Sequence, residues 1–322
     1  GSSARLFLWI YVAGIVVTAL LSNDATAVVM TPAVLAALRR AKVDPRPHLL
    51  ACALIANAAS FLLPISNPAN LVVFHRQLPP LGHWLAVFLL PSLASIGATF
   101  LCLRAECRKP LRERTAPVDG PCRLQPAGWL AVAAIAVAAV VLLVASGFGI
   151  PLGAPTFAVG VVALALVAIR DRSAPINAVR NVSWSVLPLV AGLFMIVEAL
   201  NQAGLLRLTH AGIAWLAVLH NGLGRFTGGF AVALLSNLMN NLPVGLAAGT
   251  ALRQMGHHGP LAQALLIGVD LGPNLSVTGS LATILWLIAL RRENVEFTAW
   301  SFLKVGAIVM PVALALALLA LR

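Results

Sequence analysis

The chain has 322 residues, of which 60% are hydrophobic and only 10% are charged. A soluble domain carries about a quarter charged residues, and it has nowhere to bury this much apolar surface. The composition therefore excludes a soluble protein. Because the apolar runs are continuous, it predicts an all-α polytopic membrane protein with roughly ten crossings at about 20 residues per span. The net charge of +12 is explained by basic loops on the cytoplasmic side, so we expect no nucleic-acid partner.

The sequence also argues against an enzyme. Its four cysteines form no disulfide framework, and the chain contains no Gly-rich nucleotide loop, nucleophile–base pair or metal-ligand spacing. We therefore expect a transporter that has no cofactor and does not hydrolyse ATP itself.

Two interrupted apolar segments open the chain. Residues 6–21 and 25–38 flank a polar tip at 22–24, and each piece is short for a full span. Two half-length helices around a polar tip predict a re-entrant hairpin. The next run starts at residue 49 and is broken by the prolines and asparagines of 64–70, which predicts a discontinuous helix.

A basic linker divides the chain. Residues 84–103 form a full span, and the arginine- and proline-rich linker follows at 104–126. Further spans are predicted at 127–146, 151–169 and 182–200.

The last part of the chain repeats the first pattern. Residues 204–220 are amphipathic and predict an interfacial helix, and residues 226–252 predict a second hairpin. A second discontinuous helix is expected at 260–290, interrupted after Asp270, and a last span at 299–321.

The two patterns are predicted to be repeats of one unit. The sequence Leu-Leu-Ser-Asn occurs at 20–23 and again at 234–237, at the tip of each hairpin. We therefore expect a first repeat at 1–103, the cytoplasmic linker at 104–126, and a second, inverted repeat at 127–322. Corresponding interrupted segments in two halves point to the central binding site of a secondary transporter.

The positive charges favour this topology. With the ends of the first hairpin placed inside, 17 of the 22 Lys and Arg residues fall on the cytoplasmic side. The second hairpin then enters from the opposite side, as an inverted repeat requires. The exceptions on the outer side are Arg76, Arg207, Arg225, Arg253 and Arg322.

Three acidic residues lie within apolar segments, where a carboxylate is costly and usually functional. Asp270 lies at the break of the second discontinuous helix, and Asp24 follows Ser22 and Asn23 at the first hairpin tip. A carboxylate at this depth can take up a proton, so we predict proton coupling at Asp270 and Asp24. Either residue can also serve as a helix cap, and Glu198 has the character of an interfacial side chain.

Amides and hydroxyls gather at the same breaks, where they can bind a polar substrate or satisfy freed backbone groups. Asn57 precedes Ser66 much as Asp270 precedes Ser280, so an amide and an acid are expected at matching places in the two halves. The predicted substrate-binding residues are Ser22, Asn23, Ser66, Asn67, Asn70, Ser236, Asn237, Asn240, Asn241, Asn274, Ser276, Thr278 and Ser280.

At these breaks the chain resembles the arsenite efflux permeases, or arsenical-pump membrane proteins, of the ion-transporter superfamily. The resemblance extends over nearly the whole chain, and members normally carry further spans before the position of Gly1. The matching stretches are 22–32 (SNDATAVVMTP), 65–71 (ISNPANL), 235–243 (LSNLMNNLP), 267–274 (IGVDLGPN) and 279–283 (GSLAT).

The resemblance implies export of trivalent arsenite and antimonite, as neutral trihydroxides, across the cell's inner membrane in exchange for protons. It also implies a cytosolic, arsenite-stimulated ATPase as a candidate partner. The residues agree with a neutral substrate, because no Arg or Lys lies at either hairpin tip. We therefore expect an elevator-like antiporter whose substrate lies between the hairpin tips and the helix breaks. The alternatives are a sodium-coupled organic-anion transporter of the same superfamily and a passive metalloid or anion channel.

Overall fold

A computed structural model describes residues 2–74, 78–116, 126–148, 150, 153–170, 172–181, 184, 186–220, 222–256 and 259–321. The charge count used three arginines that lie outside these ranges: Arg76, Arg123 and Arg322. The rest of the linker stretch 117–125 also lies outside them. The described residues contain helices and turns but no β-strand, apart from one isolated bridge between Ser2 and Arg114. The prediction of an all-α polytopic membrane protein is confirmed.

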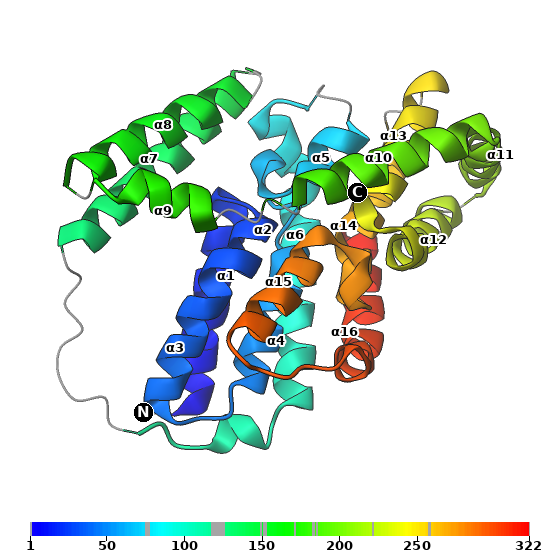
Figure 1. The fold of residues 1–322 in the computed structure, drawn as a ribbon. Helices are drawn as coiled ribbons and strands as arrows, with labels where there is room; N and C mark the ends of the chain where they lie inside the picture. Colours follow the sequence, from blue (N-terminus) through cyan, green and yellow to red (C-terminus); the bar gives the residue numbers. More distant parts are fainter. Residues whose placement is uncertain are drawn as a thin grey trace.

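The first hairpin reverses direction at Leu21 and Ser22 (Figure 1). Its first arm is α1 (Ser3–Leu20), and its second arm is α2 (Asn23–Ala25), a π-helical stretch at Thr26–Met30 and α3 (Thr31–Ala41). The expectation that both arms are short is wrong for α1. The Ser2 side chain caps this helix ahead of its apolar run, so its 18 residues are long and apolar enough to cross a membrane.

The next helix is discontinuous. It runs as α4 (Arg46–Ala58), passes through turns and a 3₁₀ segment at Pro64–Ser66, and resumes as α5 (Pro68–Val73). The first half ends earlier than the predicted boundary at residue 63, because the Ser60 N–H and hydroxyl both turn back to the Asn57 carbonyl. The long helix α6 (Leu81–Glu106) follows.

Three helices after the linker lie apart from the first hairpin in Figure 1. They are α7 (Pro126–Gly147), α8 (Gly153–Arg170) and α9 (Ala174–Asn181). α7 packs along α8 and also contacts α6. Many apolar side chains of α7 and α8 are exposed, which suits a surface that faces lipid.

Two helices then meet at a sharp bend. They are α10 (Val186–Gln202) and α11 (Leu205–Val218), and residues 191–202 make an angle of 78° with α11. Gly204 permits the bend because its φ of 105° lies in the region that favours glycine.

The second hairpin and the second discontinuous helix complete the chain. The hairpin consists of α12 (Leu223–Met239) and α13 (Asn241–Gln254), joined at Asn240. The discontinuous helix consists of α14 (Pro260–Leu271) and α15 (Leu281–Arg292), with 3₁₀ segments at Gly272–Asn274 and Val277–Gly279 between them. The last helix is α16 (Ala299–Ala320).

Within the described ranges, three helices are long and apolar enough to cross a membrane: α1, α6 and α16. The number becomes four if α10 and α11 together form one span. Such helices account for fewer crossings than length alone predicts, because the other apolar segments are broken or shorter.

The packing of the helices brings basic residues to one end of the molecule. α16 packs along α6, and the end of α6 lies with the start of α1 and the end of α3 at the bottom of Figure 1, while α15 contacts α3. Backbone hydrogen bonds join Ser3 N–H to the Glu113 carbonyl (3.0 Å) and Ala116 N–H to the Ala41 carbonyl (2.9 Å). Arg39 donates to the Glu293 carboxylate (2.8 Å) and to its carbonyl (2.7 Å).

Glycines allow α12 and α14 to lie in backbone contact. A Cβ at Gly268 would collide with the Gly229 carbonyl oxygen, and one at Gly272 would collide with the Ala233 carbonyl oxygen. This close contact holds the second hairpin directly against the second discontinuous helix. It therefore fixes the hairpin tip and the break of that helix relative to each other.

Candidate functional site

Four interruptions surround one pocket of about 300 Å³: the tips of the two hairpins and the breaks of the two discontinuous helices. Each interruption is followed by a helix that begins at this pocket: α2, α5, α13 and α15. The residues that line the pocket are Asn23, Asp24, Asn67, Pro68, Val72, Phe194, Asn241, Leu242, Ser280, Leu281 and Ala282. The fold thus brings together segments that are more than two hundred residues apart in sequence.

A polar side chain caps each of these helices. Ser22 accepts from Ala25 N–H (3.1 Å), Asn67 from Ala69 N–H (3.0 Å), Asn240 from Leu242 N–H (3.3 Å) and Ser280 from Thr283 N–H (3.2 Å). Helix N-termini carry partial positive charge from their unpaired N–H groups. Four of them facing one pocket favour electronegative atoms, such as oxygen, inside it.

Asp24 is the carboxylate at this pocket. It lies in the first turn after the Ser22 cap, its side chain is half-buried, and no Arg or Lys lines the pocket with it. The residue is therefore the one ionisable side chain among the described residues of a lining whose other polar groups are neutral amides and a hydroxyl.

Asp270 does not line the pocket but lies directly behind it. It is fully buried in the last turn of α14. Its Oδ1 accepts from the Asn67 amide (2.8 Å), and its Oδ2 accepts from the Ser60 hydroxyl (2.7 Å). Asn67 also lines the pocket, so one side chain links Asp270 to the candidate substrate site.

The partners of Asp270 suit both of its protonation states. The Ser60 hydroxyl lies 2.7 Å from Asp270 and also 2.7 Å from the Asn57 carbonyl, but it has a single proton to donate. When Asp270 is ionised, Ser60 donates to the carboxylate. When Asp270 is protonated, Asp270 donates to Ser60, which then donates to the carbonyl. Among the described residues, the sole ion pair is Arg39–Glu293, so no cation fixes Asp270 in its ionised form.

Asn57 makes the reciprocal contacts, from the first discontinuous helix to the break of the second. Its amide donates to the Asn274 side chain (3.0 Å), and its oxygen accepts from the Ser280 hydroxyl (3.3 Å). Asp270 of the second discontinuous helix therefore binds the break of the first, while Asn57 of the first binds the break of the second. An acid and an amide occupy these two positions, so only Asp270 can carry a proton.

Hydrogen bonds hold the second hairpin tip to the second break. The Asn237 amide donates to the Gly272 carbonyl (2.9 Å), and the Asn237 side-chain oxygen accepts from Ser276 (2.7 Å). The Thr278 hydroxyl donates to the Asn237 carbonyl (3.1 Å), and the Asn240 amide donates to the Thr278 carbonyl (3.3 Å). These residues shape the pocket from outside its lining.

Three other predicted residues satisfy backbone groups. Ser66 donates to the Ala19 carbonyl (3.0 Å), and Ser236 donates to the Val232 carbonyl in its own helix (2.8 Å). The amide of Asn70 donates to three carbonyls of the first break, those of Ser60, Leu63 and Pro64. Broken helices free carbonyls such as those bonded by Asn70, whereas Ser236 bonds back to a carbonyl one turn earlier in its own unbroken helix.

The predicted residues thus fall into two sets. Asn23, Asp24, Asn67, Asn241 and Ser280 line the pocket. The others lie behind or beside it and make structural hydrogen bonds: Ser22, Ser66, Asn70, Ser236, Asn237, Asn240, Asn274, Ser276, Thr278 and Asp270.

Sequence reasoning missed two contributors to this region. Ser60 contacts Asp270 but lies before the predicted break, and Phe194 lines the pocket from α10. A serine one turn after Asn57 was the available signal for Ser60, whereas nothing in the sequence marked Phe194. Glu198, also on α10, is exposed and accepts from Gln202 (3.4 Å), as an interfacial side chain does.

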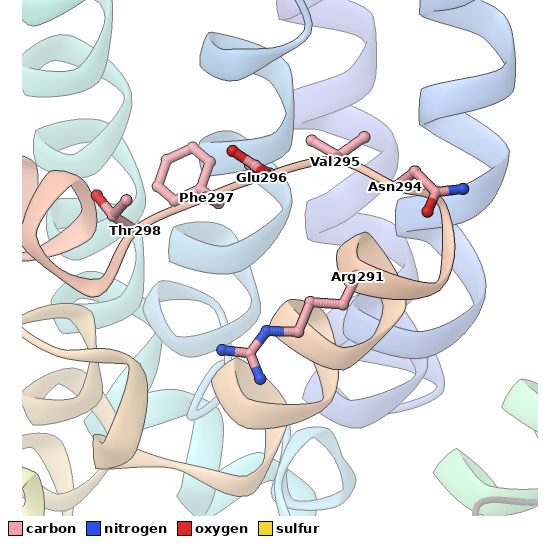
Figure 2. A pocket seen from close by; sticks show the side chains of 6 residues that line it. All are labelled: Arg291, Asn294, Val295, Glu296, Phe297 and Thr298. Atoms are coloured by element: carbon pink, nitrogen blue, oxygen red, sulfur yellow. The ribbon is translucent and has the colours of Figure 1, made fainter.

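A second pocket, of about 430 Å³, is less suited to a transport site (Figure 2). Its labelled side chains all come from the end of α15 and the following loop, residues 291–298. The pocket is therefore lined by a single stretch of the chain. Its described lining contains no residue from a hairpin tip or a helix break, and neither Asp24 nor Asp270.

The chain is similar to known transporters over most of its length. A family model described as "Citrate transporter" matches residues 1–268. The arsenical pump membrane protein of Escherichia coli (strain K12) is 32% identical, in an alignment that covers 100% of this chain and 78% of that protein. The protein of the same name from Yersinia enterocolitica is 31% identical with the same coverage.

These similarities agree with the apolar helices and with the family that the sequence motifs indicated. The chain therefore belongs both to the family that the citrate transporter model describes and to that of the arsenical pump membrane proteins, and it is a multi-pass membrane transporter rather than an enzyme.

Proposed function

We propose that the chain exports trivalent arsenite and antimonite, as neutral trihydroxides, from the cytoplasm across the inner membrane in exchange for protons. The names of its relatives support an arsenic substrate. The observation that carries the proposal is the pocket at the four helix breaks, with Asp24 in its lining and Asp270 behind it.

The chemistry of the lining suits a neutral trihydroxide. Such a substrate offers three hydroxyl donors and no charge, and the pocket offers three side-chain amides, the Ser280 hydroxyl and the Asp24 carboxylate. No cysteine lines the pocket. Thiolates bind soft metalloids tightly, so oxygen and nitrogen contacts favour the release that export requires.

Asp270 is the proposed proton carrier, assisted by Asp24. Protonation of Asp270 reverses its hydrogen bond with Ser60 and weakens the one it accepts from Asn67, because the acceptor loses its charge. Asn67 also lines the pocket, so the charge state of Asp270 is sensed where substrate binds. An exchanger needs proton and substrate to bind in alternation, and Asn67 is the proposed link between the two sites.

The transport movement is proposed to be elevator-like. In this reading, residues 1–103 and 127–322 are inverted repeats joined by the cytoplasmic linker 104–126. The two hairpins and the two discontinuous helices move together with the pocket. Phe194, which also lines the pocket, is on α10 and is therefore not part of this moving unit.

The direct test uses everted membrane vesicles from cells that express the full-length gene. Arsenite uptake in the absence of ATP should rise when the vesicles are acidified inside, because export from the cytoplasm becomes uptake after eversion. Asp270→Asn should insert normally and lose gradient-driven uptake. Equal gradient-driven uptake by the variant would exclude Asp270 as the carrier.

The same vesicles test the proposed cytosolic ATPase partner. Adding a purified arsenite-stimulated ATPase with ATP should increase arsenite uptake when the pH gradient is collapsed. Uptake that never responds to ATPase and ATP would limit the mechanism to proton exchange.

A second candidate function is sodium-coupled transport of an organic anion such as citrate. The match to the citrate transporter family favours it, and four helix N-termini at one pocket suit a carboxylate. The absence of Arg and Lys from the lining weighs against it. Citrate uptake driven by a sodium gradient, with no effect of arsenite, would establish this alternative.

A further inference from the structure

A groove of about 530 Å³ lies between the arms of the first hairpin, at the basic end of the molecule. α1 contacts the stretch from Asn23 to Met30 near the hairpin tip, and the arms separate towards their other ends. Helical spacing places Arg5 and Trp9 on one side of the groove. It places Ala33, Ala36 and Arg40 on the facing side.

The groove is graded from charged to apolar along the hairpin. Arg5 lies in the first turn of α1 and Arg40 in the last turn of α3, so both mark its rim. Ala33 lies seven residues before Arg40, which is about 10 Å deeper at 1.5 Å per residue. The small side chains of Ala33 and Ala36 leave space that no side chain of the described residues fills.

Both arginines are exposed and available to a ligand. Neither forms an ion pair with any acidic residue in the described part of the chain. Trp9 is 63% exposed between the charged rim and the apolar interior, at the level where tryptophan favours the membrane interface. Leu8 beside it and Val12 and Val16 beyond it on α1 are exposed apolar side chains, which continue the groove into a lipid-facing surface.

We propose that this groove binds one anionic phospholipid from the cytoplasmic leaflet. Its phosphate lies between Arg5 and Arg40, and an acyl chain lies over Ala33 and Ala36. Charge complementarity selects an anionic over a zwitterionic lipid, and basic pockets between membrane helices are known to bind such headgroups. A soluble anion would use the arginines but not the apolar depth of the groove.

The test is quenching of Trp9 fluorescence by brominated lipid in nanodiscs that contain the full-length protein. Subtracting the signal of Trp9→Phe isolates this residue from the other tryptophans. Brominated phosphatidylglycerol should quench Trp9 at a much lower mole fraction than brominated phosphatidylcholine. Each arginine near anionic lipid contributes about a fivefold preference, so Arg5→Gln/Arg40→Gln should lose about 25-fold.

A matched control separates the groove from the general charge of this face. Arg108→Gln/Arg112→Gln removes two exposed arginines from the same end and should keep the preference, because neither lines the groove. Equal quenching by both lipids in the unaltered protein would overturn the proposal. Loss of quenching on addition of millimolar inorganic phosphate would identify a phosphate-ion site instead. Protection of Trp9 from both lipids would show that protein, from this chain or a second copy, occupies the groove.

Discussion

At the scale of single residues, the main feature is a buried acid whose partners are all neutral. Asp270 accepts from one amide and one hydroxyl, and the hydroxyl has a second acceptor at the Asn57 carbonyl. A cation partner would hold the carboxylate in its ionised form. Neutral partners, of which the Ser60 hydroxyl can reverse its hydrogen bond, leave the proton free to bind and dissociate, which is the property a proton carrier needs.

Ser60→Ala tests this arrangement without touching the acid. The substitution removes the hydroxyl that serves both protonation states, and a hydrogen bond to a charged group is worth about 1.5–3 kcal/mol. Gradient-driven arsenite uptake should therefore fall at least about tenfold while membrane insertion is kept.

Ser95→Ala is the matched control, because Ser95 is equally buried and donates to the neighbouring Ala58 carbonyl but does not contact Asp270. Equal losses in the two variants would mean that the effect comes from the helix break and not from the acid.

At the scale of elements, the interruptions are the part of the fold that the sequence predicts best. Proline and asparagine at 64–70 and at 272–274 cannot continue an apolar helix without loss of backbone hydrogen bonds. The direction of each side chain at a break is harder to predict. Helical spacing no longer applies there, and the two discontinuous helices contact each other so that Asn67 lines the pocket while Asp270, its hydrogen-bond partner, does not.

Helix boundaries also differ from the predicted ones for local reasons. α1 starts at its Ser2 cap, and α4 ends where Ser60 bonds back to Asn57, so hydropathy alone misplaced both. Ser60 was missed for the same reason, since it was assigned to a helix that had already ended.

The tip of the second hairpin gives a prediction about stability. Asn240 has a φ of 73°, and its side chain caps α13. Asn240→Ala loses the cap and keeps the unfavourable backbone angle, which should cost about 2 kcal/mol in the free energy of unfolding. Asn240→Gly also loses the cap, but glycine adopts this φ angle without strain. Its loss in the free energy of unfolding should therefore be less than half as large.

Thermal unfolding of the full chain in a mild detergent measures both variants. Asn240→Ala should have the lower Tm of the two. Equal Tm values would show that the lost side-chain cap, and not the backbone angle, dominates at this tip.

At the scale of the whole molecule, the fold separates two kinds of polar residue. Amides, a hydroxyl and the Asp24 carboxylate meet at the central pocket, and arginines gather at the start of α1 and the ends of α3, α6 and α15. By the positive-inside rule we expect this basic end to face the cytoplasm. The charge pattern of the sequence could predict the segregation, because most charged residues lie outside the apolar segments or at their ends. The meeting of the four breaks required the fold.

This orientation can be tested by labelling single cysteines in a chain whose four natural cysteines are replaced by serine. Arg112→Cys lies at the basic end, so an impermeant maleimide should label it in everted vesicles but not in intact cells. Gly256→Cys follows α13, the second arm of the second hairpin, and should give the opposite result if the second repeat is inverted. Labelling of both positions from the same side would contradict the inverted repeat, because the two hairpins would then enter the membrane from one face. It would also remove the proposed two-sided access to the pocket, since that access requires each hairpin tip to reach the pocket from its own side of the membrane.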